Sequence, residues 1–297
     1  MKIGVVIITY NPDIELFTRV IDSLIEKFQK VCVVDNGSSN YNELRMVLTS
    51  PKIELISLPV NEGIAKATNV GFHYFQESDY DFVMTSDQDS LYPIDYYDNI
   101  VTNCNYFSSE LETIAAFCPI FYDENTKQDG QIVKKSKFYM KKTSLTNEFE
   151  DVFETIASGL VINMKNLNEI GFMDESLFID WVDFEWCWRA YYKEKRIICC
   201  KNLRISHRLG DGTKKILNRN ISIHSYIRNY YITRNAFYLS THTMYLSKSA
   251  KLIIFFKSFQ YIIIFPLISN DSFKNLCFTL RGFVDGLKGK MGKITLK

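Results

Sequence analysis

Four segments near the start of the chain decide the fold, and each combines an apolar pattern with polar turn residues: KIGVVIITYNP at 2–12, VCVVDNGSS at 31–39, NEGIAKATNVG at 61–71 and FVMTSDQDS at 82–90. Apolar, β-branched runs predict four strands, near 3–8, 31–34, 53–57 and 81–85. Helical spacing predicts the helices between them, near 14–28, 41–48 and 64–76. Strands that alternate with helices form a parallel sheet with right-handed crossovers, so the sequence predicts an α/β domain.

Polar residues follow every predicted strand, and ligands of such sheets bind beyond the carboxyl ends of the strands. Taken singly, each group is also typical of a turn or a helix N-cap. After the fourth strand come Asp87 and Asp89, two carboxylates that are two residues apart. Such a pair can hold Mg²⁺ or Mn²⁺ together with the phosphates of a ligand. The pattern Asp-x-Asp is weak alone, and its position at a strand end strengthens it.

The net charge of +1 hides a division of the chain. Residues 1–188 contain 14 Lys and Arg against 30 Asp and Glu, whereas residues 189–297 contain 21 against 4. This asymmetry indicates that the C-terminal third faces phosphate, nucleic acid or a lipid surface. Alternatively, the two parts neutralise each other across a packed interface. No recognition-helix or RNA-binding motif is evident, so we expect no nucleic-acid partner.

The seven cysteines form no Cys-x-x-Cys pair, which is typical of a reducing compartment. The apolar run at 3–8 is short and no small-residue cleavage site follows it, so it predicts a buried strand and not a signal peptide. These features predict a cytoplasmic protein.

Two later regions differ from the alternating pattern. Residues 122–155 are polar and Lys-rich, and they predict a long surface excursion or a solvated loop. Past residue 222 the pattern is helical, near 222–241, 244–265 and 272–287. The apolar part, 252–265, contains Lys257 and ends at Pro266, so it is a poor candidate for a membrane span. It is either a buried helix or, given the surrounding lysines, a helix that lies on anionic lipid.

The segment DWVDFEWCWR at 180–189 sets carboxylates among aromatic side chains. A partly apolar setting raises the pKa of a carboxyl toward the range of a general base. Indole rings also stack on the apolar faces of sugars, and Trp181 is the best candidate for that role. Trp188 and Trp186 are more typical of a core.

The ordered set of motifs, extended by ASG at 157–159, DWVDFEWCWR and HRLG at 207–210, resembles the family 2 glycosyltransferases. Within that family, the sequence is most similar to bacterial rhamnosyltransferases of surface polysaccharide synthesis. The likeness covers about residues 1–235. It implies the GT-A fold: a Rossmann-like, mostly parallel central sheet flanked by helices. We expect this domain at 1–220, with a nucleotide-sugar half at 1–90 and an acceptor half at 91–220. A C-terminal helical region follows at 221–297.

The resemblance also implies roles for residues of this chain. The nucleotide-sugar site would comprise Thr9, Asn11, Asp35, Asn61, Gly63, Asn69, Asp87 and Arg234. Asp35 would accept a hydrogen bond from the pyrimidine ring. Asp89, His207 and Asp87 would hold the Mg²⁺ or Mn²⁺ ion. Arg228 and Arg234 are six residues apart and cannot both face one phosphate on a straight helix, and Arg234 is the one favoured.

In the family pattern Glu-Asp-x-Asp/Glu, the second residue is the catalytic base, which aligns with Asp183. Val182 stands where the family usually has Glu, so Asp180 remains a competing candidate for the base. Glu185 would fix the helix or contact the acceptor, together with Trp181.

These expectations combine into one function. It is inverting, metal-dependent transfer of a sugar, L-rhamnose from dTDP-L-rhamnose, to a hydroxyl of a growing, lipid-linked surface polysaccharide. The enzyme would act at the inner face of the cell membrane. The alternatives are a UDP-hexose donor, or a protein that binds nucleotide sugars or glycans without catalysis.

Overall fold

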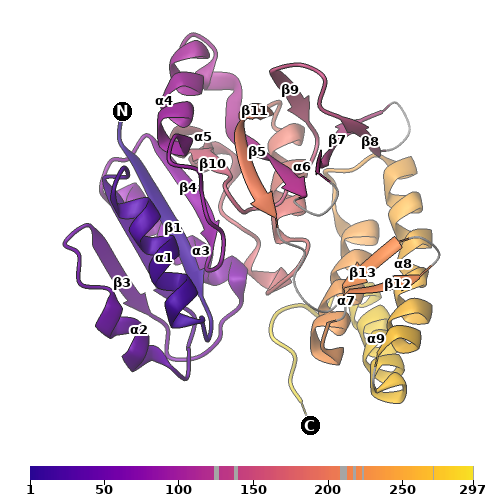
Figure 1. Ribbon diagram of the computed structural model, residues 1–297. Coiled ribbons are helices and arrows are strands. Elements are labelled where there is room, and N and C mark those ends of the chain that lie inside the picture. The colour runs from indigo at the N-terminus through magenta and orange to yellow at the C-terminus, as the bar shows by residue number, and fades with distance from the viewer. Residues whose placement is uncertain are drawn as a thin grey trace.

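The computed structural model describes residues 1–123, 127–136, 140–207, 213–216, 219–222, 224–269 and 271–296; within 207–222 it describes the backbone alone. Its first half contains the expected βα units (Figure 1). The strands are β1 (Ile3–Thr9), β2 (Lys30–Asp35), β3 (Ile53–Ser57) and β4 (Phe82–Asp87). The helices that alternate with them are α1 (Ile14–Ile25), α2 (Tyr41–Val47) and α3 (Ile64–Glu77). These four strands pair in parallel, as predicted, and their order in the sheet is β3-β2-β1-β4.

The same sheet continues beyond β4 with further strands in the order β10-β5-β11-β9. They are β5 (Ile114–Asp123), β9 (Phe149–Val152), β10 (Val161–Asn163) and β11 (Arg196–His207). Strand β10 runs antiparallel to β4 and β5, whereas β11 is parallel to β5. Helices α4 (Tyr96–Tyr106), α5 (Met164–Ile170) and α6 (Val182–Tyr192) connect these strands, with short 3-10 turns at η1 (Leu111–Thr113) and η2 (Glu175–Leu177). The predicted α/β class and mostly parallel sheet are confirmed.

Alternation along β1 divides the core between the two faces of the sheet. Val5 and Ile7 pack with α1 on one face, and Val6 packs with α3 on the other. Helix α3 comes close to the sheet because Gly71 lies against Val6, where an added Cβ would lie 2.4 Å from a methyl carbon. Trp186 and Trp188 have no exposed surface, which confirms the core position predicted for them.

The polar region at 122–155 is more regular than an extended loop. A short strand, β6 (Gln128–Asp129), pairs with β5, and β7 (Gln131–Lys135) pairs with β8 (Met140–Ser144) as a hairpin. Strand β9 then joins the edge of the main sheet next to β11. An ion pair between Lys134 and the buried carboxylate of Glu150 links the hairpin to this edge. The high lysine content therefore belongs largely to strands with an exposed side.

The C-terminal region is helical, as expected, and lies beside the end of the sheet (Figure 1). A backbone hairpin of β12 (Thr213–Ile216) and β13 (Arg219–Ser222) precedes it. Its helices are α7 (Tyr226–His242), α8 (Lys248–Ile268) and α9 (Ser272–Leu287). Phe237 of α7 contacts Phe259 of α8 and Phe283 of α9, at ring-centroid distances of 5.1 and 4.7 Å. Helix α8 continues past Pro266, which the sequence had suggested as its end.

Candidate active site

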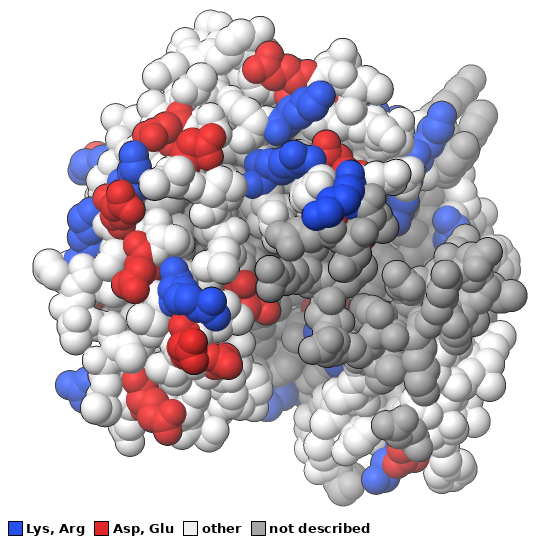
Figure 2. Space-filling view, in the orientation of Figure 1, with Lys and Arg blue, Asp and Glu red and all other residues white. Residues whose placement is uncertain are grey.

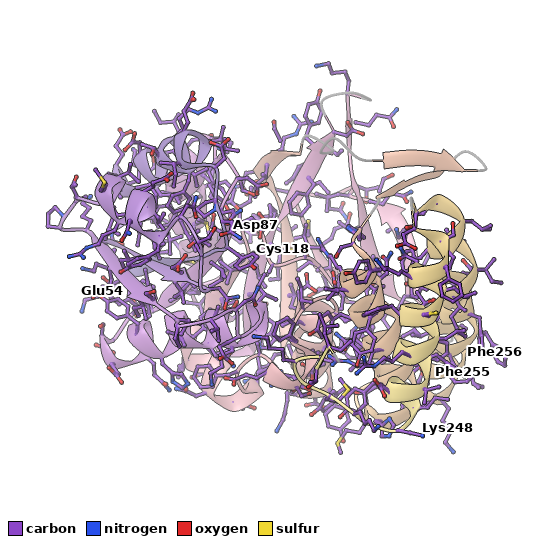
Figure 3. All side chains as sticks on the ribbon, turned by 90° about the horizontal axis from the view of Figure 1, so that it is seen from below. Glu54, Asp87, Cys118, Lys248, Phe255 and Phe256 are labelled. Atoms are coloured by element: carbon purple, nitrogen blue, oxygen red, sulfur yellow. The ribbon has the colours of Figure 1, made fainter. Side chains whose placement is uncertain are left out.

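A cavity of about 650 Å³ opens at the carboxyl ends of β1 and β4. The loop after β4 forms one wall, and the segment from Phe178 to Phe184 forms another. In Figure 3, Asp87 lies in the middle of the molecule, between the N-terminal half and the C-terminal helices. The cavity brings together these residues of the predicted site: Asn61, Gly63, Asp87, Asp89, Asp180, Trp181 and Asp183.

Asp183 lies on the cavity wall in the first turn of α6. Its carboxylate accepts hydrogen bonds from the backbone N–H groups of Phe184 at 2.9 Å and Ala157 at 3.2 Å. Burial raises the pKa of Asp183 to about 7, and the charge of Asp180 adds to this increase, although the two N–H donors oppose it. A carboxyl with a pKa near neutrality can take up a proton during a reaction at physiological pH.

Asp180 is held differently, in an ion pair with Arg228 of α7. The guanidinium Nη2 lies 3.0 Å from Oδ1, and Nε lies 3.2 Å from Oδ2. Both side chains line the cavity. Because a guanidinium already holds its carboxylate, Asp180 is less available than Asp183 to contact an acceptor hydroxyl.

The backbone around Asp180 is unusual, because three non-glycine residues have positive φ angles: Phe178 at 66°, Asp180 at 63° and Trp181 at 66°. Asn235 of α7 stabilises this segment by donating to the carbonyl oxygens of Leu177, Ile179 and Asp180, at 2.8–2.9 Å. Strained backbone that persists through such contacts is common at functional sites. Sequence patterns gave no signal for this strain.

Trp181 lines the cavity, and a hydrogen bond from its indole N–H holds the ring in place. The indole Nε1 donates a hydrogen bond of 3.1 Å to the carbonyl oxygen of Ile232. Its ring meets that of Phe184 edge-on, with a centroid distance of 5.9 Å. The indole is thus oriented before any ligand binds.

Thr9, Asn11 and Asp35 shape the loops beside the cavity but do not line it. Asp35 is fully buried and accepts from the Thr9 hydroxyl at 3.2 Å and the Ser38 N–H at 3.1 Å. The side chain of Asn11 accepts from the N–H of Ser39 at 2.8 Å. These contacts join the turns that follow β1 and β2, so all three residues order the rim of the site.

Asn61 and Gly63, in the turn before α3, line the cavity, and Gly63 also packs closely against Phe178. Asn61 accepts from the N–H of Gly63 at 3.0 Å. Gly63 has a φ of 91°, and an added Cβ would lie 2.6 Å from the Phe178 ring, so only glycine fits without strain. Asn69, by contrast, does not line the cavity: its side chain accepts from the N–H of Met173 at 2.9 Å and donates to the carbonyl oxygen of Met173 at 3.0 Å.

Arg234 does not lie at the nucleotide-sugar site, contrary to expectation. Of the two roles expected for Glu185, the structure favours the one in which it fixes the helix. Arg234 is fully buried and donates to the carbonyl oxygens of Leu177 and Gly292, so its guanidinium is used inside the protein. Among the residues that the structure describes, Arg228 is the arginine that lines the cavity. Glu185 is also buried and pairs with Arg189 at 2.8 Å, which fits the alternative that it fixes the helix.

Asp87 and Asp89 are both exposed at the cavity wall. Two strand-end carboxylates are a donor set that fits Mg²⁺ or Mn²⁺, because these ions bind one or two carboxylates and complete their shell with phosphate and water. Within the described part of the chain, no group of three or more His, Cys, Asp and Glu side chains is placed to hold a metal. The side chain of His207, expected as a further ligand, lies outside the described residues.

Some cavity residues carried no assigned role before the structure was known. Gln88 accepts from the N–H of Tyr10 at 2.9 Å and so joins the ends of β4 and β1. Ser158, which lines the cavity, shares a hydrogen bond of 2.9 Å with Ser90 in the loop after β4. Gln88 and Ser158 are inner residues of the motifs DQDS and ASG, so their position in these motifs is the sequence signal for a place at the cavity.

The fold resembles those of solved glycosyltransferases. The crystal structure of GalNAc-T7 with UDP, GalNAc and Mn²⁺ aligns with a TM-score of 0.58 at 14% identity, over 87% of this chain and 54% of that chain. The S. aureus TarS fragment 1-349 in complex with UDP-GlcNAc aligns with a TM-score of 0.58 at 16% identity, over 97% and 82% of the two chains. The chain therefore has the GT-A fold, with an acidic cavity at the carboxyl ends of its strands.

The chain belongs to glycosyl transferase family 2, whose profile matches residues 4–166. It is 35% identical over 241 residues to the dTDP-rhamnosyl transferase RfbF of Shigella flexneri, which covers 80% of this chain and 79% of that protein. The protein is therefore a glycosyltransferase enzyme. The predicted likeness to the bacterial rhamnosyltransferases of this family is confirmed.

Proposed function

We propose that the enzyme transfers L-rhamnose from dTDP-L-rhamnose to a hydroxyl of a growing surface polysaccharide, with inversion at the anomeric carbon. The observation that carries this proposal is the position of Asp183, whose pKa is raised to about 7, in the same cavity as Asp87 and Asp89. The similarity to a dTDP-rhamnosyl transferase supports the choice of donor sugar.

The mechanism is a single displacement. Asp183 accepts the proton of the acceptor hydroxyl as that oxygen forms a bond to the anomeric carbon and the bond to the diphosphate oxygen breaks. The N–H groups of Phe184 and Ala157 hold the carboxylate in position for this step. No covalent bond forms between sugar and enzyme, because the carboxylate takes a proton and does not attack carbon.

The remaining groups of the cavity act on the donor diphosphate. Asp87 and Asp89 would hold a Mg²⁺ or Mn²⁺ ion, which when bound neutralises charge on the departing nucleoside diphosphate. His207 is kept as a further candidate ligand. Arg228 also lines the cavity and pairs with Asp180 through Nε and Nη2; its guanidinium would turn to the phosphate oxygens of a bound donor. Asn61 and Gly63 line the cavity and would contact the nucleotide sugar. Thr9, Asn11 and Asp35 would act by ordering the loops beside it, and Asn69 by fixing the backbone of Met173.

The acceptor binds on the other side of the reacting carbon, beside Trp181. The indole ring lines the cavity and its N–H is already used, so its apolar face is available to a sugar ring. We propose a lipid-linked acceptor, and with it a cytoplasmic enzyme at the inner face of the cell membrane. The basic C-terminal third supports this location.

A donor screen tests the proposal. The purified enzyme is incubated with Mn²⁺ or Mg²⁺ and with dTDP-L-rhamnose, UDP-glucose or UDP-N-acetylglucosamine, and nucleoside diphosphate release is followed. We expect release from dTDP-L-rhamnose above all, and its loss in Asp183→Asn. Asp22→Asn, which changes an exposed carboxylate of α1, is the control. Preferred release from a UDP-hexose overturns the donor assignment, and tight binding without release from any donor favours a binding protein.

A further inference from the structure

The outer surfaces of α8 and α9 carry an apolar stripe each, and together we call them the α8–α9 face. Every large apolar side chain in the two stripes is at least 37% exposed. They are Leu252, Phe256, Phe259, Ile263 and Leu267 on α8, and Phe273, Leu276, Leu280, Val284 and Leu287 on α9. Adjacent members of each stripe are three or four residues apart, so each stripe follows one side of its helix.

Most of each stripe lies away from the surfaces that the two helices use for packing; Phe259, at the edge of its stripe, also contacts Phe237 and Phe283. Helix α8 buries Ala250, Ile254 and Ser258, and α9 buries Thr279 and Gly282. In Figure 3, Phe256 lies at the outer edge of the molecule, with Lys248 at the start of the same helix. A soluble monomer rarely exposes so many large apolar side chains together, so the face is shaped for a partner.

The excess of positive charge around the α8–α9 face indicates that its partner is anionic. Residues 244–297 contain nine Lys and Arg but only two Asp and Glu, and one of these two, Asp285, is buried. Among the residues that the structure describes, Lys248, Lys251 and Lys288 have no carboxylate within ion-pair distance. A second copy of the chain would bring the same positive charge and be repelled, whereas anionic lipid attracts it.

The described charges are unevenly distributed over the face of the molecule in Figure 2. Lys, Arg, Asp and Glu intermingle over the N-terminal half on the left, whereas the described surface of the C-terminal helices at the lower right is mostly uncharged (Figure 2). A mixed charged surface is typical of contact with water, and an apolar surface with basic residues near its helix ends is typical of contact with a bilayer.

Helix α8 is also long and apolar enough to cross a membrane, with a mean hydropathy of 1.7 over its most apolar window. This differs from the sequence expectation, because the helix extends beyond Pro266. Lys257, however, lies midway along α8 and is exposed. Spanning would place its ammonium near the bilayer centre, where a charged side chain is unfavourable. Packing against α7 and α9 also fits a helix that lies along the surface.

We infer that the α8–α9 face docks the enzyme on an anionic lipid bilayer, with the exposed apolar side chains inserted among the acyl chains and the lysines at the headgroups. This inference rests on the proposed function, because it identifies the surface that brings the active site to a membrane-held acceptor. The segment that follows α9 connects the docking helices to the active site, because it bonds to residues near the cavity. The N–H of Gly292 donates to Ser176 at 2.7 Å, and Lys293 donates to the carbonyl of Asn61 at 2.7 Å.

Co-sedimentation of the full-length enzyme with vesicles tests the inference. Vesicles of phosphatidylcholine alone are compared with vesicles that also contain phosphatidylglycerol. We expect binding to the anionic vesicles, weakened by salt, and little binding to the neutral ones. The double change Phe256→Ser/Phe273→Ser removes side chains that are 67% and 77% exposed and should lower binding about tenfold or more.

The matched control is Met46→Ser/Ile94→Ser, since these side chains are 78% and 77% exposed elsewhere. It should bind vesicles like the wild type. Equal vesicle binding by the two double variants overturns the inference. A wild-type dimer that becomes monomeric in Phe256→Ser/Phe273→Ser, without vesicle binding, also overturns it and assigns the face to a second copy. Vesicle binding without nucleoside diphosphate release from any donor would reject the proposed function and leave the docking surface standing.

Discussion

Replacing Asp183 by asparagine should stabilise the folded enzyme at neutral pH while it removes activity. Burial raises the pKa of Asp183 to about 7, whereas an unfolded aspartate titrates at about 4. Ionising this carboxyl would cost the folded state at most about 4 kcal/mol. Because the side chain faces a cavity open to solvent, screening reduces the cost to about 2–3 kcal/mol. The N–H of Ala157 loses its acceptor, which offsets about 1 kcal/mol.

The sign of the pH dependence follows from these pKa values. Between about pH 4 and pH 7 the folded wild type holds a proton that the unfolded chain has lost. The stability that this proton gives is complete below pH 4 and is lost as the pH rises through 7. The asparagine variant has no such proton. Its free energy of unfolding, relative to that of the wild type, should therefore rise by about 1–3 kcal/mol between about pH 5 and pH 8.

Guanidinium denaturation at the two pH values measures this change. Asp22→Asn, an exposed carboxylate on α1, serves as the control and should show no comparable dependence on pH. If Asp183→Asn were destabilised by the same amount at both pH values, the raised pKa of Asp183 and the argument for a buried base would be refuted.

Four further outcomes are expected. The rate of transfer should rise with pH to a plateau, with a midpoint near the pKa of Asp183, about 7; a midpoint near 4 would assign a different base. Asp89→Asn should raise the Mn²⁺ concentration for half-maximal activity about tenfold or more, and an unchanged metal titration would exclude this ligand. Arg228→Ala should lower donor turnover about 10²-fold, while Arg234→Met should mainly lower stability, by about 3 kcal/mol or more; equal stability losses would contradict the different roles of the two arginines. Gly63→Ala should lower the melting temperature because its Cβ meets Phe178, and an unchanged value would refute that contact.

Local patterns predicted the N-terminal half of the fold because strand and helix periodicity is a short-range signal. The apolar run Ile3–Ile8 and the helical spacing from Ile14 onward correspond to β1 and α1. The strand-end position of Asp87 and Asp89 follows from topology alone, since parallel strands bring their carboxyl ends to one edge. Their arrival in one cavity with Asp183 depends on the second half of the sheet, which the sequence placed only through the family resemblance.

The roles of Arg234 and Asn69 depend on long-range contacts that no local pattern reveals. Arg234 reaches the carbonyl oxygens of Leu177 and Gly292, both more than fifty positions away in the chain. Asn69 bonds Met173, more than one hundred positions away. An arginine in a basic region and an asparagine in a family motif look like ligand contacts, and only the fold shows that each one joins separate segments of the protein.

The most direct test of the central claim compares the wild type, Asp183→Asn and Asp180→Asn in the release of dTDP from dTDP-L-rhamnose with acceptor present, together with the dissociation constant of the donor. The account predicts that Asp183→Asn lowers turnover about 10²- to 10⁴-fold with an unchanged donor dissociation constant, and that Asp180→Asn retains substantial turnover. Near wild-type turnover in Asp183→Asn, with turnover abolished in Asp180→Asn, would contradict it.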